Sequence, residues 1–304
     1  MKLAIDTIPS AGFQAQIDAA FGAGAVQAFA PGNPPPADTE VLLHVLAPVS
    51  AAAIAGAPGL RLIQKLGVGV NTIALDAAKA QGVAVCNMPG VNAQAVAECA
   101  LTLLLAVLRR TVALDAATRA GQWAVPSAVL DTMGEVAGRT IGLVGMGNSA
   151  ARLARALEAL GAEVVFTART RHADKPWRQL PLDQLLAISD VVSLHVPLTD
   201  ETANLVDPLA MKRGAVLINV ARGGLVDEAR LAEALRNGHL RGAGLDVFAT
   251  EPVDRADLLL ALPNVVVSPH VAWQTPETLA RSLAAAAENV RRLAAGDPLL
   301  NQVI

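Results

Sequence analysis

The chain contains no tyrosine, and aromatic residues make up only 3% of its 304 positions. Charged residues are also sparse, at 17%, whereas apolar residues reach 53%. This composition lies outside that of disordered proteins. Because alanine, valine and leucine supply much of the apolar content, we expect tight packing of helices on sheets rather than aromatic clusters. The length suits two domains better than a single core.

No apolar run is long enough to cross a membrane. The longest, residues 99–108, is closed by Arg109 and Arg110, whereas a spanning helix needs about 20 residues. The amino-terminal sequence reaches Asp6 before a signal-peptide core can form, so we expect a cytoplasmic protein. The net charge of −3 and the pI near 6.0 give no general attraction to nucleic acid or to anionic membranes. We therefore expect neither as a partner.

Cysteine is scarce, and its pattern is not that of a disulfide or metal site. Cys86 and Cys99 form no CxxC pair and lie in apolar surroundings, so we expect buried, unpaired thiols. The histidines are isolated from one another and from the cysteines; they are His44, His172, His195, His239 and His270. This spacing predicts no metal.

Short apolar segments alternate with helical ones along nearly the whole chain. The first series of expected strands is 3–5, 41–46, 62–66 and 83–86. The second series is 140–144, 163–167, 191–195, 216–220, 244–248 and 265–268. Expected helices include 148–160, 227–237 and 277–295. Because these strands are continuously apolar and alternate with helices, the sequence predicts an α/β protein with parallel sheets.

A long apolar helix, about residues 93–120, separates the two series of strands. The last helix, 277–295, has no strand left to cover in the second series, so we expect it to return to the first domain. These features predict an outer, substrate-binding domain of residues 1–98 plus 276–304. Residues 99–275 would form an inserted dinucleotide-binding domain.

The strongest local pattern is a GxGxxA turn between an expected strand and an expected helix. Gly145 permits the tight turn, Gly147 lets the backbone approach a pyrophosphate, and Ala150 allows close helix packing. Asn148 and Ser149 open the helix, whose free N–H groups would attract the phosphates. The pattern predicts a dinucleotide cofactor.

The next strand lacks the acid that often binds the adenosine ribose. Ala168 occupies that position, and Arg169, Thr170 and Arg171 follow it. Guanidinium groups and hydroxyls suit a phosphate monoester, so we expect NADP(H) to be preferred and keep NAD(H) as the alternative. A basic turn that only faces solvent is the competing interpretation.

Several motifs in one order make a family resemblance specific. They are GMGNSA, LHVPLTDET, NVARGGLVDE, GLDVFATEP and SPHVAW, with KLGVGVNTIALDAAKAQGVAVCNMPG near the amino terminus. Together they resemble the D-isomer-specific 2-hydroxyacid dehydrogenases, and among these the glyoxylate and hydroxypyruvate reductases. The resemblance implies two Rossmann-like or flavodoxin-like doubly wound parallel-sheet domains with a cleft between them.

The resemblance also implies roles for three residues. Arg222 would bind the carboxylate and carbonyl oxygen of the substrate, and His270 would act as acid and base with Glu251 as its partner. Reduction of a 2-oxo acid to the D-2-hydroxy acid would take hydride from nicotinamide C4 and a proton from His270. A carboxylate at Glu251 favours this chemistry over formate oxidation, for which relatives pair the histidine with glutamine.

Other positions can be assigned through the same resemblance. Expected cofactor contacts are His195, Pro197, Thr202, Val220, Ala221 and Asp246, the last toward the nicotinamide carboxamide. Expected substrate contacts, besides Arg222 and His270, are Val68 and Gly69 in a two-glycine turn and Trp273. The family also implies a homodimer formed through the inserted domain, with the helix near 93–120 at the interface.

Other functions stay open at this point. One is a broad-specificity D-2-hydroxyacid dehydrogenase that uses NAD or either nicotinamide cofactor, and a more distant one is phosphite oxidation. A protein of another class, a nucleotide-sensing partner protein like the corepressors of the family, would retain the same residues. Turnover of small 2-oxo acids separates the enzymes from that class.

Overall fold

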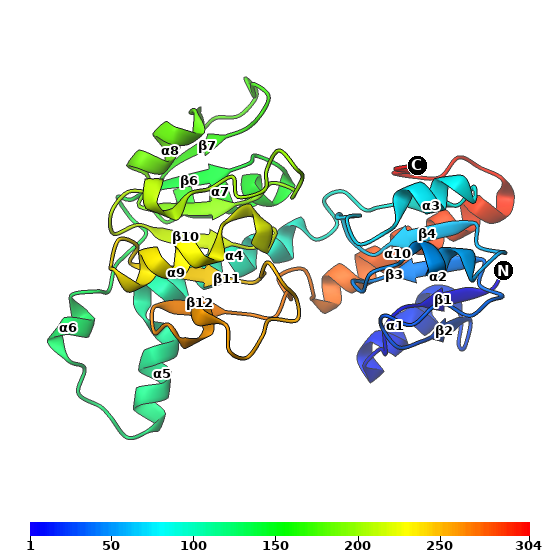
Figure 1. The fold of residues 1–304 in the computed structure, drawn as a ribbon, viewed down its shortest axis with the longest axis horizontal. Helices are drawn as coiled ribbons and strands as arrows, with labels where there is room; N and C mark the ends of the chain where they lie inside the picture. Colours follow the sequence, from blue (N-terminus) through cyan, green and yellow to red (C-terminus); the bar gives the residue numbers. More distant parts are fainter. The chain divides into compact units, whose positions relative to one another are not determined.

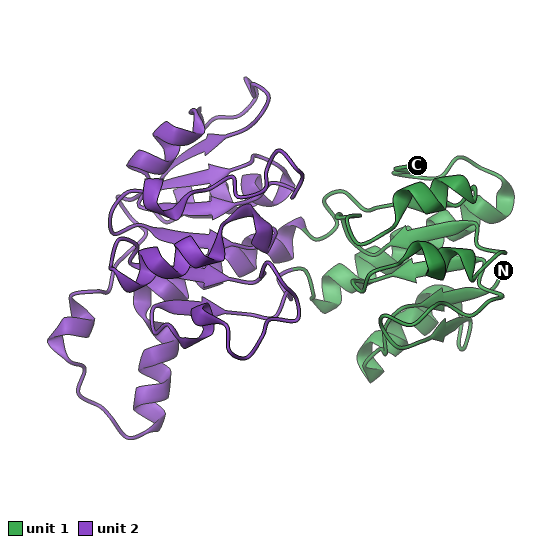
Figure 2. Cartoon of the chain, viewed as in Figure 1, with its two compact units in different colours: residues 1–92, 273–304 green, residues 93–272 purple.

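The chain, described over residues 1–304 in a computed structural model, divides into two compact units (Figure 2). Unit 1 comprises Met1–Asn92 and Trp273–Ile304, and unit 2 comprises Ala93–Ala272. The boundaries between the units therefore lie after residues 92 and 272. The sequence had predicted them after residues 98 and 275. They differ because the helix that begins at Ala93 packs on the strands of unit 2, whereas Trp273 packs on the core of unit 1.

Unit 1 contains a sheet of five parallel strands in the order β2-β1-β3-β4-β5, which is flavodoxin-like (Figure 1). The strands are β1 (Leu3–Ile5), β2 (Val26–Ala28), β3 (Val41–His44), β4 (Leu62–Lys65) and β5 (Ala84–Cys86). One face is covered by α1 (Ala11–Phe21) and α10 (Pro276–Ala295). The other is covered by α2 (Ala51–Ala55) and α3 (Leu75–Ala80).

Unit 2 contains seven parallel strands in the order β12-β11-β10-β9-β6-β7-β8. Counted from β6, this is the Rossmann order with one strand added. The strands are β6 (Thr140–Val144), β7 (Glu163–Thr167), β8 (Arg178–Gln179), β9 (Val191–Leu194), β10 (Val216–Asn219), β11 (Gly242–Leu245) and β12 (Val265–Val267). The predicted fold class, two doubly wound parallel sheets, is confirmed.

Helices cover both faces of the second sheet, because successive strand residues point to opposite sides. Val191 packs with α4 (Ala93–Arg109) and α7 (Asn148–Ala159), whereas Val192 packs with α8 (Leu182–Ile188) and α9 (Glu228–Arg236). Short 3₁₀ helices follow several strands: η1 (Pro208–Ala210), η2 (Gly223–Leu225) and η3 (Leu258–Ala261). Both faces are therefore buried, as the continuous apolar runs predicted.

The expected helix over residues 93–120 is two helices. Arg110 has a left-handed φ of 55°, which ends α4 and starts α5 (Thr111–Arg119) in a new direction. No residue of α5 is buried, so packing does not hold it in line with α4. We call residues 111–130, comprising α5, the connection through Trp123, and α6 (Ser127–Leu130), the arm. Figure 1 shows the arm extending from unit 2 without covering its sheet.

The register of the second sheet aligns the predicted site residues along one edge. Val144 pairs with both Thr167 and Leu194, Leu194 pairs with Asn219, Asn219 with Leu245, and Leu245 with Val267. The residues that follow these strand ends are thus neighbours at the carboxyl edge, where open parallel sheets bind ligands. The turn at Gly145 lies where the strand order reverses, between β6 and β9.

Candidate active site

Gly145 begins the turn after β6, and its surroundings accept only glycine. Its φ is 96°, its N–H donates to the Thr167 carbonyl (2.8 Å), and a Cβ there would lie 2.7 Å from the His195 carbonyl oxygen. At Gly147, in contrast, a Cβ would meet no atom within 4 Å. No side chain caps the first turn of α7 behind it. Uncapped N–H groups facing open space fit a pyrophosphate.

His195 connects this turn to the neighbouring strand. Its Nδ1 lies 3.2 Å from the Ser149 hydroxyl on α7, and its Nε2 lies 2.9 Å from the Ser193 hydroxyl on β9. Burial lowers the pKa of His195 to about 4. The imidazole is therefore neutral near pH 7 and links the first turn of α7 to β9 instead of acting as an acid. Ser193 is a partner that sequence reasoning missed.

The basic turn after β7 is held by a residue that the sequence did not suggest. Gln179 on β8 donates from Nε2 to the carbonyls of Ala168 (3.1 Å) and Thr170 (2.9 Å). Its Oε1 accepts the N–H of His172 (3.0 Å). Arg169 is 90% exposed and lies 3.8 Å from Glu201, a pair of little energetic weight in solvent. Thr170 and Arg171 are also exposed, so the turn's polar groups are accessible to a ligand.

The loop after His195 is closed by Thr202. Its hydroxyl donates to the Pro197 carbonyl (2.7 Å) and accepts the N–H of Thr199 (2.7 Å). Thr202 therefore shapes this loop through a side-chain turn, while Pro197 is exposed at its start. Direct contact of either residue with a cofactor stays a prediction.

Arg222 follows β10 and is oriented by Asn219, a second residue that was missed. The buried Asn219 amide accepts the N–H of Ala221 (3.1 Å) and donates to the Arg222 carbonyl (2.8 Å). The Arg222 guanidinium donates to the Ala221 carbonyl (2.6 Å). Burial lowers the pKa of Arg222, and the charge of Glu251 opposes that effect. Val220 is buried beside this turn.

The turns that carry Arg222 and Glu251 are in direct backbone contact. A Cβ on Gly223 would lie 1.9 Å from the Phe248 carbonyl carbon and 2.2 Å from the Ala249 nitrogen. Only glycine permits this approach. The main chains that carry the Arg222 and Glu251 side chains are therefore held at one relative position.

Glu251 and His270 are in contact, as the motifs predicted, and their acid–base role stays a prediction. Glu251 Oε2 lies 2.6 Å from His270 Nδ1, and Glu251 Oε1 accepts the Phe248 N–H (3.0 Å). Burial acts to raise the pKa of Glu251, but the bonds from His270 and Phe248 and the charge of Arg222 outweigh it and keep that pKa below its usual value. The carboxylate thus fixes the ring through Nδ1 and leaves Nε2 for a ligand.

Asp246 is fully buried and supports the turn that carries His270. Its carboxylate accepts the N–H groups of Val271 (3.0 Å) and Ala272 (2.8 Å) and the Ser268 hydroxyl (2.5 Å). Its carbonyl accepts the His270 N–H (2.7 Å). The structure thus gives Asp246 a supporting role for His270, and its predicted contact with the nicotinamide stays a prediction.

In unit 1, the predicted substrate turn lies at the carboxyl edge of the first sheet. The Val68 side chain is 41% exposed, and the N–H groups of Val68 and Gly69 donate to no protein acceptor. The Val68 carbonyl accepts the Asn87 amide (2.9 Å). Free N–H donors suit a carboxylate. Trp273 is half-buried against the core of unit 1.

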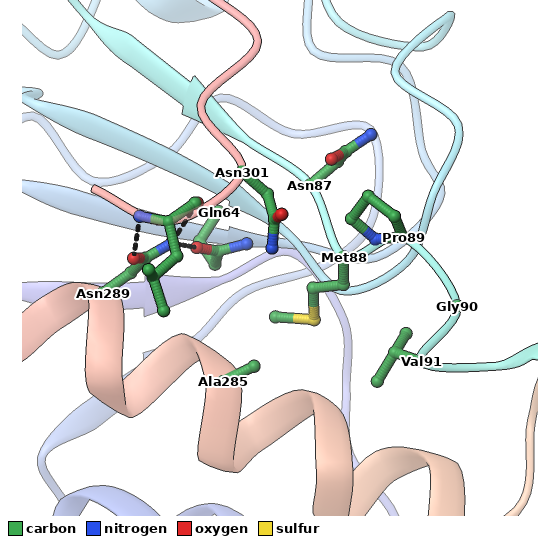
Figure 3. Close-up of a pocket in the computed structure, with 10 residues that line it drawn as sticks. Gln64, Asn87, Met88, Pro89, Gly90, Val91, Ala285, Asn289 and Asn301 are labelled. Atoms are coloured by element: carbon green, nitrogen blue, oxygen red, sulfur yellow. Dashed lines mark hydrogen bonds between the residues drawn. The ribbon is translucent and has the colours of Figure 1, made fainter. Parts of the chain in front are cut away.

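A cavity of about 340 Å³ lies within unit 1, and none of the predicted catalytic residues lines it (Figure 3). Part of its polar wall is already bonded, since the Asn289 amide donates to Gln64 (2.7 Å) and to the Leu300 carbonyl (3.0 Å). Met88 and Ala285 add apolar surface. The cavity presents no buried unsatisfied group that would select a ligand.

The cysteines are unpaired. Burial raises the pKa of Cys86 and of Cys99 to about 11, with the charge of Asp246 adding to the effect at Cys99. Both thiols are therefore protonated and poorly nucleophilic near pH 7. No group of three potential ligands could hold a metal ion, and no helix is both long and apolar enough to span a membrane.

The sequence of the chain is similar to those of known proteins. Residues 101–272 match the model of the D-isomer specific 2-hydroxyacid dehydrogenase NAD binding domain. The chain is 40% identical to D-3-phosphoglycerate dehydrogenase of Mycobacterium leprae over 97% of its own length and 56% of that protein. It is 38% identical to glyoxylate reductase of Korarchaeum cryptofilum over 88% of its own length and 84% of that protein.

Solved structures are also similar to the chain over its whole length. A crystal structure of a protein from Thermus thermophilus matches with a TM-score of 0.87 and 37% identity, covering 100% of both chains. The chain spans about half the length of the phosphoglycerate dehydrogenases that it matches, 56% and 50% in two cases. By its matched domain and by these relatives, the chain belongs to the D-isomer specific 2-hydroxyacid dehydrogenase family.

Proposed function

We propose that the protein reduces a small 2-oxo acid, of the glyoxylate or hydroxypyruvate kind, to the D-2-hydroxy acid, with NADPH preferred to NADH. The observation that carries this proposal is the Glu251–His270 pair at the same sheet edge as Arg222 and the Gly145 turn. Relatives named glyoxylate reductase, which this chain covers to 84% and 80% of their length, support it.

Each residue of the candidate site has a separate role in the proposed reaction. A bound nicotinamide supplies hydride from its C4 to the carbonyl carbon. Arg222 holds the substrate carboxylate and carbonyl oxygen with its planar fork. His270 donates a proton from Nε2 to that oxygen, while Glu251 bonds to Nδ1 and orients the ring. The N–H groups of Val68 and Gly69 add donors for the carboxylate.

The charges of unit 1 favour a substrate without a phosphate group. The connections that follow its five strands lie at the carboxyl edge beside the predicted substrate turn, residues 67–69, and contain no lysine or arginine. Lys65 ends β4, but it is buried and bonded to the Val45 carbonyl; Arg281 on α10 donates to the Val91 carbonyl. A phosphate ester is usually bound by several cationic donors. A small uncharged substituent on the 2-oxo acid is the better match.

Oxidation of D-3-phosphoglycerate is the second candidate, because the mycobacterial enzymes of that name are 40–43% identical. The two candidates are separated by kcat/KM for glyoxylate, for hydroxypyruvate and for hydroxypyruvate 3-phosphate. A preference for the phosphate ester would overturn the substrate proposal. Absence of turnover with all three would instead favour a nucleotide-sensing protein.

Cofactor preference is expected to depend on the basic turn. We expect hydroxypyruvate reduction to have a higher kcat/KM with NADPH than with NADH. Arg169→Ala should lower the NADPH value about 10–100-fold, as expected for lost hydrogen bonds to a charged phosphate. The NADH value should be unchanged, because no 2′-phosphate is present. Steady-state rates with both cofactors measure the effect.

Arg178→Ala is the matched control for this test. Arg178 is an exposed arginine of the neighbouring strand β8 and pairs with Glu163 (3.2 Å). Its removal changes the net charge as Arg169→Ala does, without changing the turn. An equal loss in both variants would mean a general charge effect. An NADH preference in the unmodified protein would mean that the arginines only face solvent.

We also propose that the arm forms the interface of a homodimer. Its exposed apolar side chains are Trp123 (87% exposed), Val112, Val125 and Leu130. Contiguous exposed apolar surface commonly marks an interface. Within the segment that the family resemblance placed at the interface, α4 buries one face in unit 2, whereas no residue of α5 is buried.

Replacing Trp123 with glutamate is expected to convert a dimer into a monomer of 31.2 kDa, because a charge at a buried interface is strongly unfavourable. Sedimentation velocity at micromolar concentration measures the mass. Leu258→Glu, at an exposed leucine outside the arm, is the control and should leave the dimer intact. A monomeric unmodified protein would contradict the proposal.

A further inference from the structure

Three polar residues form a hydrogen-bonded chain at the carboxyl edge of the first sheet. Pairing of Ile5 with Leu43 places Asp6 beside His44, which ends β3. Asp6 Oδ2 bonds to His44 Nδ1, and His44 Nε2 lies 2.8 Å from the Thr72 hydroxyl. Asp6 and His44 are 4% and 0% exposed. No motif in the sequence indicated this arrangement.

The protonation of the chain follows from its surroundings. Burial lowers the pKa of His44, and the nearby charge of Lys65 adds to this, whereas the bond and the charge of Asp6 oppose it. The ring is therefore neutral near pH 7. Because a carboxylate only accepts, Nδ1–H donates to Asp6, and Nε2 accepts the Thr72 hydroxyl hydrogen. The other Asp6 oxygen accepts the Val45 N–H (2.6 Å).

Thr72 closes the segment that contains the predicted substrate turn. At the start of this segment, the Gly67 carbonyl accepts the Met88 N–H (2.8 Å), and Asn87 holds the Val68 carbonyl. At its end, the Thr72 hydroxyl is held by His44. The free N–H groups of Val68 and Gly69 thus lie between two fixed points.

We propose that the Asp6–His44–Thr72 chain positions the Val68–Gly69 N–H groups for the substrate carboxylate. His44 and Thr72 are positioning residues, since they act through the turn and do not touch the substrate. This inference rests on the proposed reduction of 2-oxo acids. It adds a determinant of substrate affinity that lies wholly within unit 1.

The test compares Thr72→Val, which removes the hydroxyl at nearly constant shape, with Thr72→Ser, which retains it. Loss of one net hydrogen bond corresponds to a change in binding affinity of about 3–10-fold. We expect Thr72→Val to raise KM for the 2-oxo acid by that factor, with kcat and KM for the nicotinamide cofactor unchanged, because the turn binds ground and transition states alike. Thr72→Ser should restore KM to within about twofold.

Controls separate positioning from general stability. Thr39→Val removes a hydroxyl from another buried threonine of unit 1, just before β3 at the opposite edge, and should leave KM unchanged. Thr72→Ala replaces Thr72→Val if the latter does not fold. Inhibition by oxamate, an unreactive 2-oxo acid mimic, should weaken in parallel with KM.

The outcomes are distinct. Unchanged KM in Thr72→Val, with an active unmodified protein, would overturn the positioning role and leave the proposed function intact. Equal defects in Thr72→Val and Thr72→Ser, or a parallel rise in KM for the cofactor, would indicate a purely structural role and also overturn it. An unmodified protein that turns over no 2-oxo acid would overturn both proposals.

Discussion

Replacing His270 with asparagine is expected to lower kcat/KM for 2-oxo acid reduction by about 10²–10⁴-fold, the usual contribution of a positioned acid. The carbonyl oxygen needs a proton as hydride reaches the carbon. Glu251 holds His270 Nδ1 at 2.6 Å, so Nε2 is the nitrogen left to donate it. Because the proton moves in the transition state, kcat should fall with kcat/KM. Steady-state kinetics with a small 2-oxo acid measure the loss.

Glu251→Gln refines this test, because it keeps an acceptor for Nδ1 but removes the charge. The bonds and charges that keep the pKa of Glu251 low, against the opposing effect of burial, leave it ionised throughout the neutral range. A neutral partner bonds Nδ1 less strongly, because the hydrogen bond is no longer charge-assisted, so the ring is held less firmly and kcat for reduction should fall. The fall should be smaller than in His270→Asn, because the proton donor itself remains. Full activity of Glu251→Gln or of His270→Asn would contradict the assigned pair.

Arg222→Lys is expected to lower kcat/KM by about 10²–10³-fold although the charge is retained, because one or two charge-assisted hydrogen bonds are lost. Lysine offers a point charge in place of a fork that can hold the carboxylate and the carbonyl oxygen together. The loss should appear in both KM and kcat, since the carbonyl oxygen gains charge in the transition state.

The matched control is Arg230→Lys on α9. Arg230 is an exposed arginine of the same unit and pairs with Asp207 (2.7 Å). Its replacement should change kcat/KM by less than about twofold, as for other exposed ion pairs. Equal kinetics of Arg222→Lys and the unmodified protein would exclude a fork-like role for Arg222.

Long, continuously apolar strands and the glycine turn were predictable because each depends on contiguous residues. The strands β2 and β8 were missed since each is short, and β2 has only Val26 buried. The break between α4 and α5 depends on the lack of packing beyond Arg110. No glycine or proline at this point of the sequence indicates a break. Hydropathy patterns carry little information about such exposed segments.

The candidate site residues could be picked out from the sequence where a motif contains them. Arg222, Glu251 and His270 each stand in such a motif. Gln179 was not predictable, since its bonds to the basic turn join residues distant in sequence. The support that Asp246 gives to the His270 turn was not predictable either, because its carboxylate accepts main-chain N–H groups and the Ser268 hydroxyl only in the folded chain. Which hydrogen-bond partners a polar side chain finds depends on tertiary contacts, and the sequence alone does not give these.

The placement of the three tryptophans has a spectroscopic consequence. Trp123 lies exposed on the arm, Trp177 is buried between the basic turn and β8, and Trp273 begins the second segment of unit 1. Because the chain has no tyrosine, its near-ultraviolet fluorescence comes from these indoles with almost no background. Variants that keep one tryptophan and replace the others with phenylalanine would report separately on self-association, on the cofactor turn and on the junction of the units. The protein thus carries its own optical probes, and none of its proposed interactions needs an added label.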